Sequence, residues 1–190
     1  MAPHAVLAEI GVPYELALVE RGSSAYLAVN PAGLVPTLED GDLVLTESAA
    51  ICLHLADRVP EARLLPRIGT RERSDTYRWL MFLTNTVQTA HLRHFYPERY
   101  GTQGVKETAD AELHGLFDRI DAHLAGREWL VGDERTVADL FLFMLTRWGR
   151  FLEPPAWERR NLRAHWLRTA ELPGVRRMLD EQELETPQLD

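Results

Sequence analysis

The sequence changes character near residue 65, and this change constrains the fold more than any other feature. Before it, short apolar runs alternate with turn signals, a pattern typical of a small unit that mixes strands and helices. After it, apolar residues recur at helical spacing over long stretches. The sequence therefore predicts an α/β unit at residues 1–65, followed by an all-helical unit at residues 70–190.

Charge and composition exclude several classes of protein. The 21 Lys and Arg residues against 29 Asp and Glu residues give a net charge of −8, which argues against nucleic-acid binding. The longest apolar run, Leu140 to Leu145, is about six residues and far short of a membrane span. The single cysteine, Cys52, excludes an internal disulfide framework. Since the first ten residues also lack the pattern of a signal peptide, we expect a cytoplasmic protein.

Turn residues divide the first unit into short elements. Gly11, with Pro13 two positions later, ends a first helix at residues 4–10. Alternation of Tyr14, Leu16 and Leu18 predicts a strand over 14–19. The remaining predicted elements are a helical turn at 25–29, a strand pair at 37–39 and 43–46 around Asp40-Gly41, and a helix at 47–59.

Five helices are predicted in the second unit, at 70–95, 105–124, 136–152, 156–169 and 173–181. The helix at 136–152 is apolar on nearly every side, which predicts that it is the central buried helix. Thr136 and Asp139 have the spacing of a capping box at its start, and we assign them a structural role.

Glu47 and Ser48 stand where a predicted strand ends and a helix begins. A helix N-terminus presents free amides and the positive end of a dipole, so it attracts carboxylates. Ser48 adds a hydroxyl donor and Glu47 an acceptor for an ammonium group, a pair that suits an α-amino acid. The alternative is helix capping alone, which these two residues favour when taken by themselves.

A second candidate feature is Leu34-Val35-Pro36, immediately before a predicted strand. If the Val35–Pro36 bond is cis, the backbone of Val35 faces outward with its N–H and C=O unpaired. An extended peptide ligand then adds to the sheet as a further strand. The alternative is an ordinary proline at a sheet edge.

The order and spacing of these features resemble the glutathione S-transferase family, bacterial type, over nearly the whole chain. The first helix and the stretch that follows it are similar to those of bacterial members. The matching segments are 30–38 (NPAGLVPTL), 45–57 (LTESAAICLHLAD), 130–133 (LVGD) and 136–139 (TVAD).

This resemblance implies a thioredoxin-like N-terminal domain, an all-helical C-terminal domain and glutathione as co-substrate. Val35, beside a cis Pro36, is expected to pair with the cysteinyl backbone of glutathione, while Glu47 and Ser48 hold its γ-glutamyl end. The expected reaction is attack of the glutathione thiolate on a small electrophile held in an apolar pocket of the second domain, in a homodimer.

The family opens with a strand and a catalytic Tyr, Ser or Cys, whereas this sequence begins at the first helix. We therefore expect the sequence to be truncated at its N-terminus, and the catalytic residue is unknown. Cys52 is a poor substitute because it shares the inner helix face with Ile51 and Leu55, which predicts a core position.

Residues of the first long helix are weaker candidates. His91 and His94 lack a third metal ligand, so we predict a solvated or pocket-lining role and no metal site. Gln88 stands where some family members have a functional His. Arg93 or Arg99 would offer positive charge near a thiolate.

Two hypotheses follow from the sequence. In the first, the protein is a glutathione transferase that acts on small electrophiles. In the second, it is a non-catalytic glutathione-binding or dimerisation module that has lost the first strand and the catalytic residue.

Overall fold

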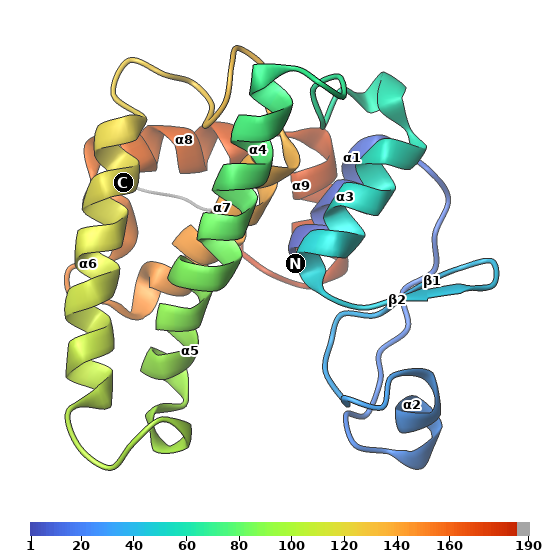
Figure 1. The fold of residues 1–190 in the computed structure, drawn as a ribbon, viewed down its shortest axis with the longest axis horizontal. Coiled ribbons are helices and arrows are strands. Elements are labelled where there is room, and N and C mark those ends of the chain that lie inside the picture. Colours follow the sequence, from blue (N-terminus) through green and yellow to red (C-terminus); the bar gives the residue numbers. More distant parts are fainter. Residues whose placement is uncertain (186–190) are drawn as a thin grey trace.

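The computed structural model describes residues 1–185. The N-terminal part contains α1 (Ala2–Ile10), α2 (Ser24–Val29), the strands β1 (Leu38–Asp40) and β2 (Leu43–Leu45), and α3 (Ser48–Arg58). Gly11 ends α1 in the left-handed conformation, as its position predicts. The two strands form the predicted antiparallel hairpin, with Leu38 opposite Leu45. Figure 1 shows α1 and α3 side by side, with the hairpin and α2 extending away from the helices.

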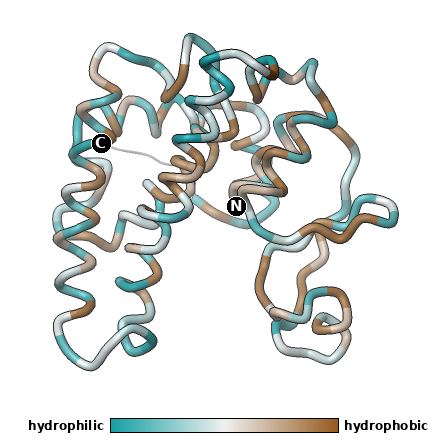
Figure 2. The backbone as a smooth tube through the Cα atoms, viewed as in Figure 1, coloured by the Kyte–Doolittle hydropathy of each residue, from teal (hydrophilic) through white to brown (hydrophobic). Residues whose placement is uncertain are grey.

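The predicted strand at 14–19 is wrong. The chain there forms no strand, and the only sheet of the described residues is the hairpin. The side chains of Leu16 and Leu18 are exposed to solvent and do not form a buried strand face. The physical reason is that a strand needs a neighbour for its hydrogen bonds, and residues 1–185 place none beside this segment. Figure 2 shows hydrophobic stretches on the hairpin and on the loops below it, outside the helical core.

The rest of the described chain is helical and follows the predicted order. It contains α4 (Arg71–Phe82), a π-helical segment (Leu83–Gln88), α5 (Thr89–Phe95), α6 (Val105–His123), α7 (Val137–Trp148), α8 (Arg160–Ala170) and α9 (Pro173–Glu181). Short 3-10 turns lie at Pro60–Ala62, Pro97–Arg99, Gly149–Phe151 and Ala156–Glu158. None of these helices combines the length and the apolar character that crossing a membrane requires.

The predicted helix at 70–95 is one continuous helical path with a π-helical segment in its middle. Thr70 caps its start by accepting a hydrogen bond from the amide of Arg73 at 3.2 Å. The π turn widens the helix between α4 and α5, and turns of this kind are often found at functional sites. Helical periodicity alone does not reveal such a turn, because the apolar residues on either side keep their spacing.

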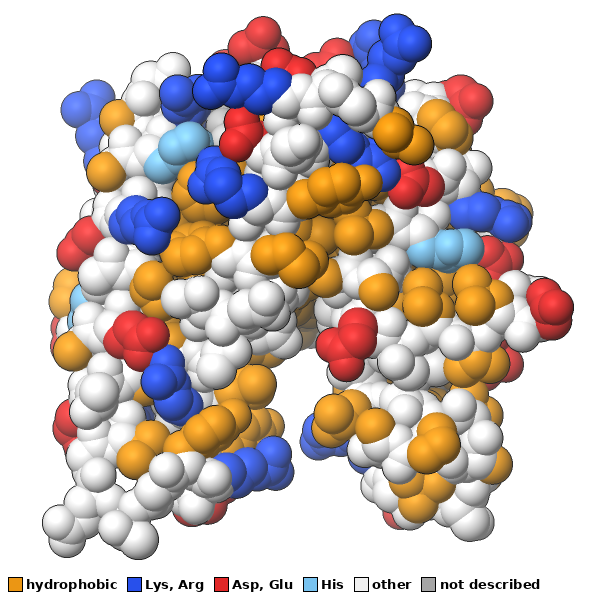
Figure 3. All heavy atoms as spheres, viewed as in Figure 1, with side chains coloured by type: hydrophobic (Ala, Val, Ile, Leu, Met, Phe, Trp, Pro, Cys, Tyr) orange, Lys and Arg blue, Asp and Glu red, His pale blue; other side chains and the backbone are white. Residues whose placement is uncertain are grey.

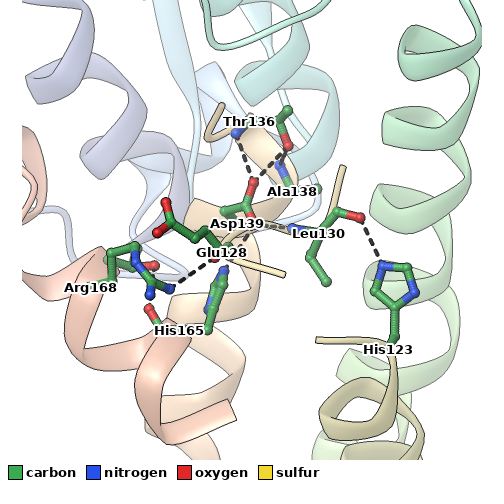
Figure 4. A network of polar contacts seen from close by, with 9 residues as sticks. His123, Glu128, Leu130, Thr136, Ala138, Asp139, His165 and Arg168 are labelled. Carbon is green, nitrogen blue, oxygen red and sulfur yellow. Dashed lines mark hydrogen bonds and ion pairs between the residues drawn. The ribbon is translucent and has the colours of Figure 1, made fainter. Parts of the chain in front are cut away.

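The central helix is α7, as its sequence predicts, and its residues from Val137 to Thr146 are all buried. The capping box at its start is formed. One oxygen of the buried Asp139 carboxylate accepts from the amide of Thr136 at 2.7 Å. The other accepts from Leu130 N at 2.8 Å and from His165 Nε2 at 2.9 Å, so Asp139 joins α7 to the preceding loop and to α8 (Figure 4).

The hydrophobic core runs without interruption from the first helices to the last. Val6 of α1 and Ile51 of α3 belong to the same buried cluster as Leu140 of α7 and Val175 of α9. The helix α1 packs most extensively against α9, so the two ends of the described chain lie against each other. The division into domains at 1–65 and 70–190 stays a prediction.

Candidate functional site

The N-terminus of α3 is open. Glu47 stands at the cap position, and its side chain forms no capping hydrogen bond. The first turn of α3 carries no acidic residue, and Ser48 Oγ forms no hydrogen bond with another described residue. Free amides and the positive end of the helix dipole therefore meet solvent beside a free hydroxyl, an arrangement that binds carboxylates.

Glu47 has an unusual backbone conformation for a residue with a side chain. Its φ is 67° and its ψ is 112°, whereas φ is negative for most non-glycine residues. Its side chain is exposed and has no ion-pair partner within residues 1–185. A non-glycine residue held in such a conformation costs about 1–3 kcal/mol, and such residues cluster at functional sites.

Val35 lies at the same end of the hairpin as Glu47. Since Leu38 pairs with Leu45, the residues just before β1 and just after β2 both lie at the open end. The preceding loop is fixed at the carbonyl of Leu34, which accepts from Tyr26 Oη at 2.5 Å and from Asn30 Nδ2 at 2.7 Å.

The backbone of Val35 itself takes part in no hydrogen bond with any described residue. Its side chain is exposed, and the Val35–Pro36 bond is cis, as the family resemblance implies. A free N–H and C=O on an exposed residue just before a strand suit the backbone of a bound peptide.

A hollow lies beside Met1. It has a volume of about 430 Å³, and aromatic and cationic side chains dominate its walls. They include Phe95, Tyr96, Arg147, Trp148, Arg150 and Phe151. Figure 3 shows a deep gap between the lower ends of α5 and α6 on one side and α2 on the other, with hydrophobic and basic side chains on its walls.

The hollow beside Met1 and the start of α3 are neighbours. Met1 lines the hollow and immediately precedes α1, which packs against α3. Figure 1 shows the N-terminus beside the beginning of α3 and at the top of this gap. The site thus has a polar part at the hairpin and α3, and an aromatic part between α5 and α7.

The solvated or pocket-lining role predicted for the two histidines of α5 is wrong. His91 is fully buried among Phe95, Phe117 and Trp148, and burial lowers the pKa of its imidazole to about 3. His94 is also buried, and its Nδ1 contacts a carboxylate oxygen of Asp110 in α6. Neither histidine lines the hollow, because their side chains point toward α6 and α7. Leu92, Phe95 and Tyr96 line the hollow instead.

The other residues considered for activating the thiolate are Cys52, Arg93, Arg99 and Gln88, and the structure shows where each one lies. Cys52 is fully buried, which confirms the core prediction, and burial raises the pKa of its thiol to about 12. Arg93 forms an ion pair with Glu112 at 2.5 Å, and the guanidinium of Arg99 stacks on the ring of Tyr96. Gln88 ends the π-helical segment.

Sequence reasoning missed the residues Arg147, Trp148 and Arg150. They follow the apolar run of α7, and a signal was present in the return of basic residues at the end of a buried helix. That signal alone does not show that α5 lies opposite them.

Family models match both parts of the chain. Residues 2–63 match "Glutathione S-transferase, N-terminal domain" and residues 82–173 match "Glutathione S-transferase, C-terminal domain". Among relatives, glutathione S-transferase GST-4.5 of Xanthomonas campestris is 37% identical over 161 residues, which cover 78% of this chain and 77% of that protein. Glutathione S-transferase GstA of Escherichia coli O157:H7 is 31% identical over 97% of this chain and 94% of that protein.

Solved structures agree. A bacterial beta-class glutathione S-transferase of Sphingomonas chungbukensis superposes with a TM-score of 0.88 at 32% identity, over 97% of this chain and 94% of that chain. A sphingomonad glutathione S-transferase complexed with glutathione gives 0.87 at 30% identity over the same shares. The two-stranded hairpin and the helices around it are thus part of a thioredoxin-like N-terminal domain, followed by a helical C-terminal domain.

Proposed function

The chain belongs to the glutathione S-transferase family, and we propose that Val35, Glu47 and Ser48 hold its glutathione at the open end of the hairpin. The protein is a glutathione transferase, with glutathione as co-substrate. In this reaction the glutathione thiolate attacks a small electrophile. The thiol must first lose its proton, because the thiolate is the nucleophile.

The observation that carries this assignment is the open N-terminus of α3 beside the exposed Glu47 carboxylate. The α-carboxylate of the γ-glutamyl group accepts hydrogen bonds from the first amides of α3 and from Ser48 Oγ. The α-ammonium group donates to the Glu47 carboxylate. Opposite charges on one ligand thus meet opposite charges on adjacent residues.

Val35 binds the middle of glutathione. Its free N–H and C=O pair with the cysteinyl backbone as in an added strand, and Pro36 sets the direction of the loop at this point. The electrophile enters the hollow beside Met1, where aromatic side chains remove it from water. The physiological consequence is removal of reactive electrophiles, that is, detoxification.

Exposed apolar side chains support a homodimer. Leu43 and Val44 of the hairpin, and Tyr77 and Met81 of α4, are all exposed in the single chain. A self-complementary pairing of such surfaces buries them in a symmetric dimer. The cytoplasm is the compartment that keeps glutathione reduced, and we place the protein there.

Calorimetric titration with glutathione tests the binding site. Replacing Ser48 by Ala removes a hydrogen bond to a charged group, so the dissociation constant is expected to rise about tenfold. Ser74→Ala, at an exposed position of α4, is the matched control and is expected to bind as the unmodified protein does. An unchanged dissociation constant in folded Ser48→Ala protein would remove Ser48 from the site.

A further inference from the structure

Two arginine side chains lie in the aromatic hollow without a carboxylate partner. Arg147, in the last turn of α7, and Arg150, in the 3-10 turn that follows, both line it. Neither forms an ion pair of 4.0 Å or less with any carboxylate in residues 1–185. Arg73 and Arg159, by contrast, each have such a pair with a carboxylate of another element.

The hydrogen bonds of these two guanidinium groups go to neutral partners. Arg147 Nη1 donates to the carbonyl oxygen of Glu185 at 3.1 Å, and Arg150 Nη1 donates to the carbonyl oxygen of Arg147 at 3.0 Å. The Arg150 guanidinium also lies 4.1 Å from the centre of the Phe151 ring. Each guanidinium has five N–H donors, so most of them stay available to a ligand.

Arg147 is half-buried and Arg150 is exposed, and their like charges repel each other. Burial, and then the neighbouring Arg150, lower the pKa of Arg147, while the Glu185 carboxylate opposes this effect. Two cations that line one hollow, with only partial compensation, favour a bound anion there.

The remaining walls are apolar and aromatic. Phe95, Tyr96, Trp148 and Phe151 surround the hollow, and the rings of Phe95 and Trp148 pack edge to face. Its volume of about 430 Å³ suits a single substituted ring. Flat aromatic walls favour flat ligands, and the arginines at the edge favour ligands with a negative charge.

We infer that the preferred electrophile of this protein is an aromatic compound that carries a carboxylate, which Arg147 and Arg150 bind while its ring lies against Trp148 and Phe95. This inference rests on the proposed function, because it assigns a substrate class to the second half of that site. In an aryl chloride of this class, the glutathione sulfur forms a bond to the ring carbon, the carbon–chlorine bond breaks, and chloride leaves with the bonding electron pair. The thiol proton passes to solvent, and no oxidant or reductant is needed.

A matched pair of substrates tests the inference. A chlorodinitrobenzoate and the corresponding chlorodinitrobenzamide have the same shape and differ in the charge of one group, and each kcat/KM is divided by the uncatalysed rate with glutathione to remove the difference in ring activation. With the unmodified protein, kcat/KM is expected to be about tenfold higher for the benzoate than for the amide. Arg147→Gln is expected to reduce this preference about tenfold. Arg150→Gln is expected to reduce it less, because Arg150 is exposed and more strongly screened.

Arg119→Gln is the matched control, since it removes the same charge from an exposed position of α6 that lines no part of the hollow. It is expected to leave the preference unchanged. A benzoate preference that is absent in the unmodified protein, or that falls equally in Arg147→Gln and Arg119→Gln, would overturn the inference.

Binding of the two compounds without glutathione separates this inference from the proposed function. If calorimetric titration shows no glutathione binding, the proposed function fails, and titration with the two compounds alone still decides the inference. Tighter binding of the benzoate, lost in Arg147→Gln, supports it; equal binding of both compounds overturns it.

Discussion

Gly174 at the start of α9 lies directly on the backbone of Glu9 in α1. The amide of Gly174 donates to Glu9 Oε2 at 2.8 Å, and Glu9 Oε1 accepts from Arg135 Nε at the same distance. A Cβ at position 174 would lie 2.3 Å from the backbone nitrogen of Glu9. Glycine is therefore required here by close packing between the first and last helices of the described chain.

Gly174→Ala is expected to lower the free energy of unfolding by about 1–3 kcal/mol, because α1 and α9 must move apart to admit one methyl group. Urea denaturation followed by circular dichroism measures this change. Gly115→Ala is the control, since position 115 of α6 has open space around it and alanine favours helices by about 1 kcal/mol. Equal unfolding midpoints for the two variants would contradict the close-packing argument.

Asp139 is the buried carboxylate on which the start of α7 depends. Its two oxygens accept from Leu130 N, His165 Nε2, Thr136 N and Thr136 Oγ1 at 2.7–3.0 Å (Figure 4). Asp139→Ala leaves these buried donors without a partner, so a loss of about 3–5 kcal/mol in unfolding free energy is expected. Thr136→Ala removes mainly a cap and is expected to cost about 1 kcal/mol. Urea titrations of both variants check this order, and a cost for Asp139→Ala no larger than for Thr136→Ala would contradict it.

The helices were predictable because their signals are local. Gly11, the Thr136–Asp139 capping box and prolines such as Pro60 and Pro97 act within one turn, and the structure places helix ends within a few residues of them. The strand at 14–19 was not predictable in this way. The alternation of Leu16 and Leu18 is a property of this segment alone. A strand also needs a partner strand, and the alternation does not show which segment that partner is.

The residues of the candidate site also differ in whether a local pattern could predict them. Val35, Glu47 and Ser48 lie close in sequence to one hairpin, so short motifs were enough to propose them. The aromatic hollow brings Tyr96 and Trp148 together from helices about fifty residues apart, and no local pattern encodes that contact. The same distance explains the misplaced His91, whose environment is set by Trp148.

Glu181 of α9 is expected to make the folded state less stable at acid pH. Its carboxylate accepts from Tyr14 Oη at 2.6 Å and from Arg177 Nε at 2.7 Å, which lowers the pKa of Glu181 from 4.5 to about 2. A lowered pKa in the folded state means that the stabilisation is complete above pH 4.5 and is lost as the pH falls toward 2. The unfolding midpoint in urea, measured at several pH values, is expected to fall more steeply for the unmodified protein than for Glu181→Gln in this window.

Asp180→Asn is the control for Glu181, since position 180 is exposed on the same helix and its side chain has no ion pair within the described residues. Its pH dependence is expected to match that of the unmodified protein. Parallel curves for the unmodified protein and Glu181→Gln would show that the contacts with Tyr14 and Arg177 do not stabilise the folded state.

The backbone of Glu47 allows stability and ligand binding to be separated at one residue. Glycine adopts positive φ without a steric cost, so Glu47→Gly is expected to raise the free energy of unfolding by about 1 kcal/mol. It also removes the carboxylate proposed to accept from the ligand ammonium, so glutathione binding is expected to weaken about tenfold. Glu47→Gln keeps the strained backbone and loses only the charge, so it is expected to weaken binding without the gain in stability. Urea denaturation and calorimetric titration of both variants check the two effects. If Glu47→Gly is more stable and binds glutathione as tightly as the unmodified protein, the strain at position 47 serves some purpose other than presenting the carboxylate to glutathione.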